Sequence, residues 1–304
     1  TTYVARLTIL VGGQTKTCPD VQFATQEGSE SCDSGMDVMY VFDYSFSMRP
    51  DIETAKSAAS SLISTIQAEV GSNAYRLGLT LVDEYASGVS INQINYYTAT
   101  EYSSLPSAQK LHYTNTEMQV YTVMEQLATD NNGTAWTDAL NKINCGQSHA
   151  DQSGVDCDDP NLAGSPNNLI IGNGASSGAE PMVPAVRRII QQPAFSGGFR
   201  SGVAKYIIMF TDRASGTETV PSNGWTTESY NELLDLVTLC NQEGIKVIVM
   251  GAGVDVEALN SITGSGTQKP YQLLASLTGG SSTASFNASD VVSAIQNACG
   301  GTPT

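Results

Sequence analysis

The sequence predicts an α/β fold: a doubly wound, mostly parallel sheet with an antiparallel strand at its edge and an N-terminal extension. Two short runs, residues 36–42 and 204–210, are mainly apolar, β-branched and aromatic, which is typical of strands buried on both faces. Between residues 51 and 70, apolar residues recur at helical spacing, which predicts a helix after the first strand. Such strand–helix units occur in open parallel sheets.

Residues 1–35 are interpreted as an extension and not as a domain. They contain one expected strand, 3–11, followed by a stretch rich in Gly, Thr and Ser that Cys18 would anchor. The α/β domain is expected to span residues 36–300, because doubly wound folds often form one long unit.

Three segments lie between the two core strands. Residues 87–97 alternate loosely in polarity and suit an edge strand, since 92–95 are too polar for a buried one. Residues 117–127 carry an apolar stripe at helical spacing, which predicts a helix packed on the core. Residues 145–183 are rich in Gly, Asn, Asp, Ser and Pro, and a helical pattern resumes only at Pro184, so we interpret this segment as an insertion.

A D-x-S-x-S motif, formed by Asp43, Ser45 and Ser47, directly follows the first core strand. It places one carboxylate and two hydroxyls in the strand-to-helix turn, at the carboxyl edge of the sheet. Oxygen groups of this kind suit Mg²⁺, which prefers octahedral oxygen coordination and keeps positions for water or for an oxygen of a partner. The alternative is ordinary turn and helix-cap chemistry, in which Asp and Ser are common.

Two further segments supply oxygen groups. The second core strand ends in Thr211 and Asp212, and a Gly turn before Thr134 opens a helix. In open parallel sheets, ligands bind outside the carboxyl ends of the strands where the strand order reverses. If the two core strands flank that point, Asp43, Ser45, Ser47, Thr134 and Asp212 surround one cation.

These five residues match the metal-ion-dependent adhesion site of the von Willebrand factor A family, which the chain resembles from about Met36 to Cys299. Residues 76–83 and 244–251 match its second and fifth core strands, and 273–280 match the helix end that leads into a last strand. The residues around the D-x-S-x-S motif look most like the inserted domain of integrin β subunits.

The resemblance implies a Rossmann-like fold, an extracellular location and a role in adhesion. Members of the family bind Mg²⁺ or Mn²⁺ at this motif, and many complete the coordination with an acidic side chain of a protein ligand. The acidic composition, the even set of cysteines and the polar loops fit equally well a structural subunit, whose partners would be neighbouring protomers in an assembly.

Two acids are candidates for a second cation site. Integrin β subunits carry an acidic pair shortly after the motif, whereas this chain has Pro50 and Asp51. Asp51 is either a weak Ca²⁺ ligand or an acid stabilised by the dipole of the helix that it precedes, and the second interpretation is favoured. Asp83 resembles a residue of a third integrin site, whose other ligands are not recognisable.

The six cysteines form an even set without a C-x-x-C motif, which indicates disulfides and an oxidising compartment. Cys145 and Cys157 bracket a short polar loop and form the favoured pair. A Cys32–Cys299 clasp resembles the one that closes some von Willebrand factor A modules, and it leaves Cys18 for Cys240. The competing arrangement pairs Cys18 with Cys32 and Cys240 with Cys299.

The charge balance excludes some classes of partner. Asp and Glu total 30 against 14 Lys and Arg, a formal net charge of −16, which argues against nucleic acid and anionic membranes. No stretch approaches the roughly 18 apolar residues of a membrane span, so no direct membrane insertion is expected.

Catalysis is not expected. The two histidines, His112 and His149, do not accompany a Gly-flanked nucleophile elbow, and no phosphate-binding Gly-rich loop ending in Lys is present. Asn132 and Asn287 stand in glycosylation sequons. Two classes of function remain: an extracellular recognition module that binds a protein ligand through its cation, and a structural subunit of an extracellular filament, coat or matrix.

Overall fold

The computed structural model describes residues 2–5, 8–11, 14–17, 21–24, 32–43, 48, 51–70, 74–82, 94–97, 118–128, 133–141, 180–212, 214–215, 225–251, 269–286, 289, 292–293 and 295–296. The N-terminal elements are β1 (Thr2–Ala5), β2 (Thr8–Val11), β3 (Gln14–Thr17), β4 (Val21–Ala24) and the 3₁₀ helix η1 (Cys32–Ser34). The remaining elements are β5 (Met36–Asp43), α1 (Ile52–Val70), β6 (Tyr75–Val82), β7 (Ile94–Tyr97), β8 (Met118–Ala128), α3 (Thr134–Asn141), α5 (Met182–Gln191), α6 (Pro193–Ser196), β9 (Ala204–Phe210), α7 (Thr227–Glu243), β10 (Ile245–Met250), α9 (Pro270–Leu277) and β11 (Ser282–Thr283).

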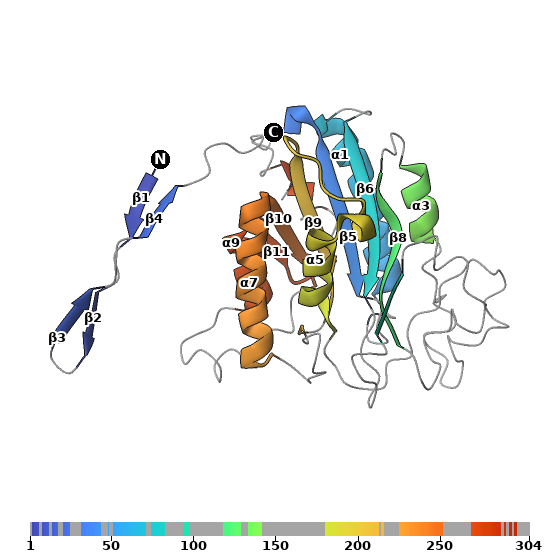
Figure 1. Cartoon of the computed structure of the whole chain (residues 1–304). Coiled ribbons are helices and arrows are strands. Elements are labelled where there is room, and N and C mark those ends of the chain that lie inside the picture. The colour runs from blue at the N-terminus through green and yellow to red at the C-terminus, as the bar shows by residue number, and fades with distance from the viewer. Residues whose placement is uncertain are drawn as a thin grey trace.

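The central sheet has the strand order β11-β10-β9-β5-β6-β8-β7. The first five of these strands are mutually parallel. Strand β8 pairs antiparallel with β6, and the edge strand β7 pairs parallel with β8, so these two strands run against the other five. Helices cover both faces (Figure 1). The predicted α/β fold with a mostly parallel, doubly wound sheet is confirmed.

The strand order reverses between β5 and β9. From β5 the sheet continues on one side with β6, β8 and β7, and from β9 it continues on the other side with β10 and β11. The prediction that the two core strands are the central pair flanking the switch point is therefore confirmed. Strands on either side of such a point open a crevice at their carboxyl ends.

Strand β5 is buried along its whole length because its two faces serve two cores. Met36, Val38, Tyr40 and Phe42 pack in a core with α1 and α3, and the alternate residues Met39 and Val41 pack in a second core with α5, α7 and α9. The two-residue period of side chains along a strand explains this division.

Helix α7 has defined signals at both ends. The side chain of Thr226 accepts a hydrogen bond from the backbone N–H of Ser229, and the Ser229 side chain accepts one from the backbone N–H of Thr226, which forms a capping box. At the other end Gly244 adopts a left-handed conformation with φ of 68°, the usual helix stop. Strand β10 follows directly.

The helix predicted for residues 117–127 is wrong, because this segment forms β8. Short apolar runs are compatible with both helical and strand spacing. The β-branched and aromatic residues at positions 120–123 favour a strand, and pairing with β6 stabilises it. Of the predicted edge strand at 87–97, the structure describes residues 94–97, which form β7 at the edge of the sheet. Helix α5 begins at Met182, two residues before the predicted Pro184.

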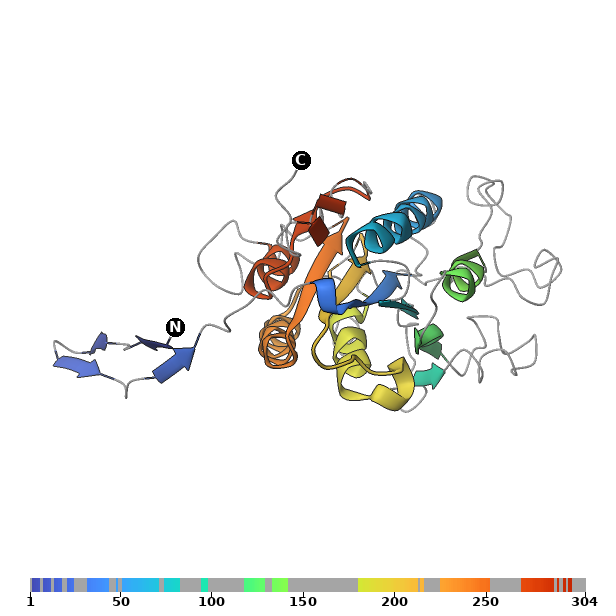
Figure 2. The same ribbon diagram turned by 90° about the horizontal axis from the view of Figure 1, so that it is seen from above.

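The N-terminal extension contains two antiparallel pairs, β1 with β4 and β2 with β3. The expected single strand over residues 3–11 is divided between β1 and β2. Both views draw these strands away from the seven-stranded sheet (Figures 1 and 2).

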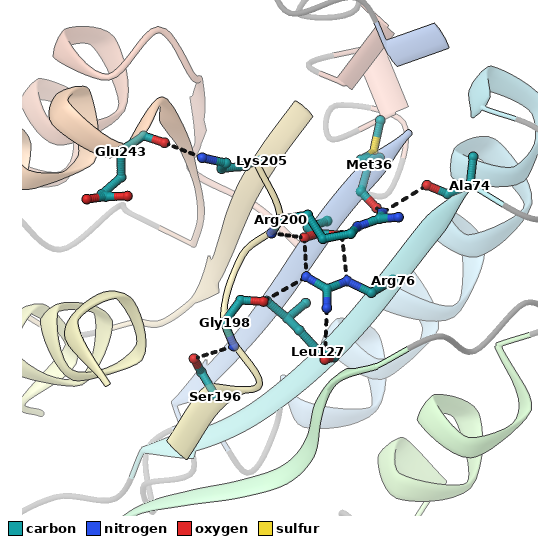
Figure 3. A network of polar contacts seen from close by, with 10 residues as sticks. Met36, Ala74, Arg76, Leu127, Ser196, Gly198, Arg200, Lys205 and Glu243 are labelled. Atoms are coloured by element: carbon teal, nitrogen blue, oxygen red, sulfur yellow. Dashed lines mark hydrogen bonds and ion pairs between the residues drawn. The ribbon is translucent and has the colours of Figure 1, made fainter. Parts of the chain in front are cut away.

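A polar network closes the end of the sheet where the parallel strands begin (Figure 3). Asp37 on β5 is fully buried and forms ion pairs with Arg76 on β6 and with Arg200 on the loop before β9. Arg76 also donates to the carbonyl oxygens of Leu127 and Gly198, at 3.4 and 2.7 Å. The network therefore joins four separate segments of the chain. We call Asp37, Arg76 and Arg200 the amino-end network.

The cysteine predictions are corrected at one position. Cys32 is disulfide-bonded, as expected. Cys240 is a free thiol, fully buried in α7 against the second core, so both predicted arrangements that pair it are wrong. The burial pattern of α7 explains this, because Cys240 occupies the core-facing position that an apolar residue would take. Cys18, Cys145, Cys157 and Cys299 lie outside the described residues.

Candidate functional site

The candidate site lies at the carboxyl ends of the two central strands. Asp43 is the last residue of β5, and Asp212 comes two residues after the end of β9. Phe42 pairs with Phe210 in parallel register. Asp43 directly follows Phe42, and Asp212 comes two residues after Phe210, so both acids lie just beyond strand residues that are side by side in the sheet. The structure thus brings these two predicted site residues, far apart in the sequence, to the same edge at the switch point.

A hydrogen bond connects the two strand ends. The hydroxyl Oγ1 of Thr211 donates to Oδ2 of Asp43 at 2.9 Å, and both side chains are fully buried. Asp212, the next residue, is half-buried. Burial of a carboxylate is costly unless hydrogen bonds or a positive charge compensate it, so Thr211 contributes to the stability of Asp43 in its charged form.

The backbone of this edge is closely packed. The backbone N–H of Thr211 donates to the Met250 carbonyl at 3.1 Å, and that of Gly251 donates to the Thr283 carbonyl at 2.8 Å. Gly251 has φ of 81°, and a Cβ there would lie 2.5 Å from the Thr211 oxygen and 2.6 Å from the Phe286 ring. Only glycine fits here, which fixes the segment that carries Thr211 and Asp212.

Sequence reasoning missed Glu180, a third acid associated with this edge. Glu180 forms an isolated parallel bridge with Ser215, three residues after Asp212, and its side chain is only 1% exposed. The hydroxyl of Ser215 accepts a hydrogen bond from the backbone N–H of Val183 at 3.0 Å, which ties the start of α5 to the segment after β9. An acid followed by Pro before a helical pattern was the available signal.

The structure does not bring Thr134 to Asp43 and Asp212. The preceding residue, Gly133, lies against α1 and the start of β6, since a Cβ there would be 3.2 Å from Ile63 Cγ2 and 3.9 Å from Tyr75 Oη. Tyr75 pairs with Met36, at the opposite end of β5 from Asp43. The reason is the direction of β8, which returns the chain to the end where the parallel strands begin before α3 starts.

The other predicted residues are placed as follows. Asp51 precedes α1, and its backbone carbonyl accepts a hydrogen bond from the backbone N–H of Ala55 at 2.8 Å; the role of its carboxylate stays a prediction. The remaining predicted residues lie outside the described residues: Ser45, Ser47, Asp83, His112, His149 and the sequon asparagines Asn132 and Asn287.

The donor set at the edge fits a hard cation. Asp43, Asp212 and Thr211 present only oxygen atoms, which Mg²⁺, Mn²⁺ and Ca²⁺ prefer. Among the described residues no group of three or more His, Cys, Asp or Glu is arranged to hold a metal. A site made of two carboxylates and several hydroxyl groups would not belong to that class, because hydroxyl groups are not among those four residue types.

The helices that the structure describes include none with the length and apolar character needed to cross a bilayer.

Comparisons with known proteins give structural likenesses only. Proximal thread matrix protein 1 from the mussel byssus matches at 13% identity with TM-scores of 0.42 to 0.45, over 88% of this chain and 47–48% of that protein. One of its structures has a zinc-occupied MIDAS motif. The pilus adhesin SpaC from Lactobacillus rhamnosus GG, in its open conformation, matches at 15% identity with a TM-score of 0.44.

The chain spans about half the length of the mussel protein, and the SpaC match covers 88% of this chain and 30% of the adhesin. No protein-family model and no curated protein matches the chain. The fold class rests on the strand order given above.

Proposed function

We propose that this chain is a recognition module that holds a divalent cation, Mg²⁺ or Mn²⁺, at the carboxyl ends of β5 and β9, and that it binds a protein partner there. The observation that carries the proposal is the position of Asp43 and Asp212 at the ends of the two central parallel strands, on either side of the point where strand order reverses. This is where open α/β sheets bind ligands.

The ligand set of the proposal combines these two carboxylates with the hydroxyls of Ser45 and Ser47. The serines come from the D-x-S-x-S motif and from the resemblance to the von Willebrand factor A family. Glu180, buried beside Ser215, places a further oxygen-bearing side chain in the segment next to this edge.

The chemistry that the cation supplies is attraction of an external anion. With neutral hydroxyls among its ligands, a bound dication keeps enough positive charge to accept a carboxylate of a partner. The chain's own residues hold and orient the ion, so the proposed role is binding and not catalysis. The disulfide at Cys32 supports an extracellular location, because structural disulfides persist in oxidising compartments.

Calorimetric titration of the full chain with MnCl₂ and MgCl₂ tests the cation site. We expect one site per chain that Asp212→Ala weakens by more than about 100-fold, since loss of an outer partner of a ligand alone costs about 10- to 100-fold. The matched control is Asp138→Ala, which removes an exposed carboxylate on α3 and should leave the affinity unchanged. No binding by the wild type, or equal binding by Asp212→Ala, contradicts the proposal.

A second measurement tests the open coordination position. Acetate added to the Mn²⁺-loaded chain should displace metal-bound water and lower the water-proton relaxation enhancement. Sedimentation with and without EDTA then separates the two partner classes: self-association that EDTA reverses assigns the carboxylate to a second copy, as in a structural assembly. An unchanged relaxation signal at saturating acetate excludes a carboxylate partner.

A further inference from the structure

The hydroxyl of Thr211 acts on the candidate site through Asp43. Its Oγ1 lies 2.9 Å from Oδ2 of Asp43, so one of the two carboxylate oxygens is held toward β9. We propose that this hydrogen bond makes Asp43 a one-oxygen ligand and thereby selects Mg²⁺ and Mn²⁺ against Ca²⁺. The inference rests on the proposed cation site and names the residue that sets its selectivity.

The hydroxyl is held rigidly. Thr211 is fully buried, its backbone N–H donates to the Met250 carbonyl, and its own carbonyl faces Gly251 with no room for a Cβ. Threonine is β-branched and stiff about χ1. If the Asp43 carboxylate rotates, the Thr211 hydroxyl cannot follow it, and the hydrogen bond is lost.

Coordination chemistry connects this hydrogen bond to ion choice. Ca²⁺ takes six to eight oxygen ligands and commonly uses both oxygens of a carboxylate, whereas Mg²⁺ requires six ligands in near-ideal octahedral geometry. Bidentate binding by Asp43 requires both oxygens to turn toward the ion. Hydrogen bonds to a charged acceptor are among the stronger ones in proteins, so this rotation penalises Ca²⁺ and leaves one-oxygen ligation of Mg²⁺ in place.

Thr211→Val tests the inference, because valine keeps the shape and removes the donor. Calorimetric affinities of the full chain for MgCl₂ and CaCl₂ should show the ratio of Mg²⁺ to Ca²⁺ affinity falling by about tenfold or more, the range for a hydrogen bond to a charged group. Thr211→Ser retains the hydroxyl and should keep the ratio within about twofold of the wild type.

The matched control is Thr80→Val. Thr80 is also fully buried in the sheet, and its hydroxyl contacts only the sulfur of Met39, at 3.4 Å, among the hydrogen bonds of the described residues. This variant loses a buried hydroxyl away from the strand ends and should leave the selectivity ratio unchanged. Thermal unfolding in EDTA checks that each variant is folded, and Thr211→Ala replaces Thr211→Val if valine prevents folding.

The outcomes separate this inference from the proposed function. A wild-type chain that binds neither cation overturns both. A wild-type chain that binds Mg²⁺, with Thr211→Val or Thr211→Ala showing the same ratio of affinities, overturns the selectivity role alone. A fall in the ratio for Thr211→Val that serine prevents, with no change in Thr80→Val, supports it.

Discussion

Asp37 and Arg76 form a buried ion pair between two neighbouring parallel strands, with Nε of Arg76 2.9 Å from Oδ1 of Asp37. Arg200 adds hydrogen bonds from its backbone N–H, at 2.7 Å, and from Nε, at 2.8 Å. Burial alone would raise the pKa of Asp37, but the hydrogen bonds from the two arginines outweigh it and hold the pKa below its usual value.

Asp37→Asn is therefore expected to destabilise the protein at neutral pH by about 3 kcal/mol, since it leaves two guanidinium groups at this end of the sheet without their counter-charge. A carboxylate with a lowered pKa contributes stability above its unfolded pKa of about 3.9, and the contribution is lost as the pH falls through the folded value. The difference between variant and wild type should shrink below about pH 4.

Urea unfolding at pH 7 and at acidic pH measures this difference, with the exposed Asp235→Asn as control. A difference of the same size at both pH values would show that the charge of Asp37 is not its source.

Tyr40→Phe is expected to stabilise the protein. The hydroxyl of Tyr40 is buried and has no hydrogen-bond partner among the residues that the structure describes, and burial raises its pKa above the usual range. Removing such a group recovers its desolvation cost, about 1 kcal/mol. Tyr75→Phe is the matched comparison: its hydroxyl accepts a hydrogen bond from Gln67 at 2.8 Å, so the variant should lose about 1 kcal/mol. Chemical denaturation gives both values, and loss of stability in Tyr40→Phe contradicts the expectation.

Gly251→Ala is expected to cost about 2 kcal/mol or more, because the new Cβ meets both the Thr211 carbonyl and the Phe286 ring in a left-handed backbone. Gly279 allows the cost of the left-handed backbone to be measured without the steric clash. It has a similar φ of 73°, but nothing lies within 4 Å of the position that a Cβ would occupy, so Gly279→Ala should show only the backbone cost, about 1 kcal/mol. Equal melting-temperature shifts in the two variants would refute the packing argument.

Cys240 is expected to resist alkylation in the folded protein, since burial raises the pKa of its thiol to about 12 and the thiolate is the reactive form. In denaturant without reductant it should react fully. Disulfides within one chain use cysteines two at a time. With Cys240 free, five of the six cysteines remain, so at least one of these five is also expected to have no disulfide partner within the chain. Non-reducing peptide mapping checks both points; a disulfide at Cys240 would contradict them.

The sequence was sufficient for features that depend on local pattern. The core strands ending at Phe42 and Phe210 have unbroken apolar composition, and this also placed Asp43 and Asp212 correctly at the carboxyl edge. Helix α1 could be predicted because Ala55, Ala59 and Leu62, all buried, recur at helical spacing.

Features that depend on strand direction could not be predicted. Nothing in the local pattern of residues 118–128 indicates that this segment runs against β6, and this direction decides that Thr134 begins its helix away from Asp43. Cys240 was misassigned for a related reason. A cysteine in a sequence can be either a buried free thiol or half of a disulfide, and only the packing of α7 distinguishes the two.

The capping box and the terminal Gly244 of α7 favour early formation of this helix, which affects the order in which the strands of the sheet assemble. Strand β9, the capped helix and β10 follow one another in the chain, so closing this unit costs little loop entropy. The junction of β5 with β9 joins residues as far apart as 168 positions, as in the contact of Thr211 with Asp43. During refolding, the strands on the two sides of this junction are therefore expected to gain order separately before they meet. Because the proposed cation edge lies at the junction itself, ion binding would report that β5 and β9 have paired.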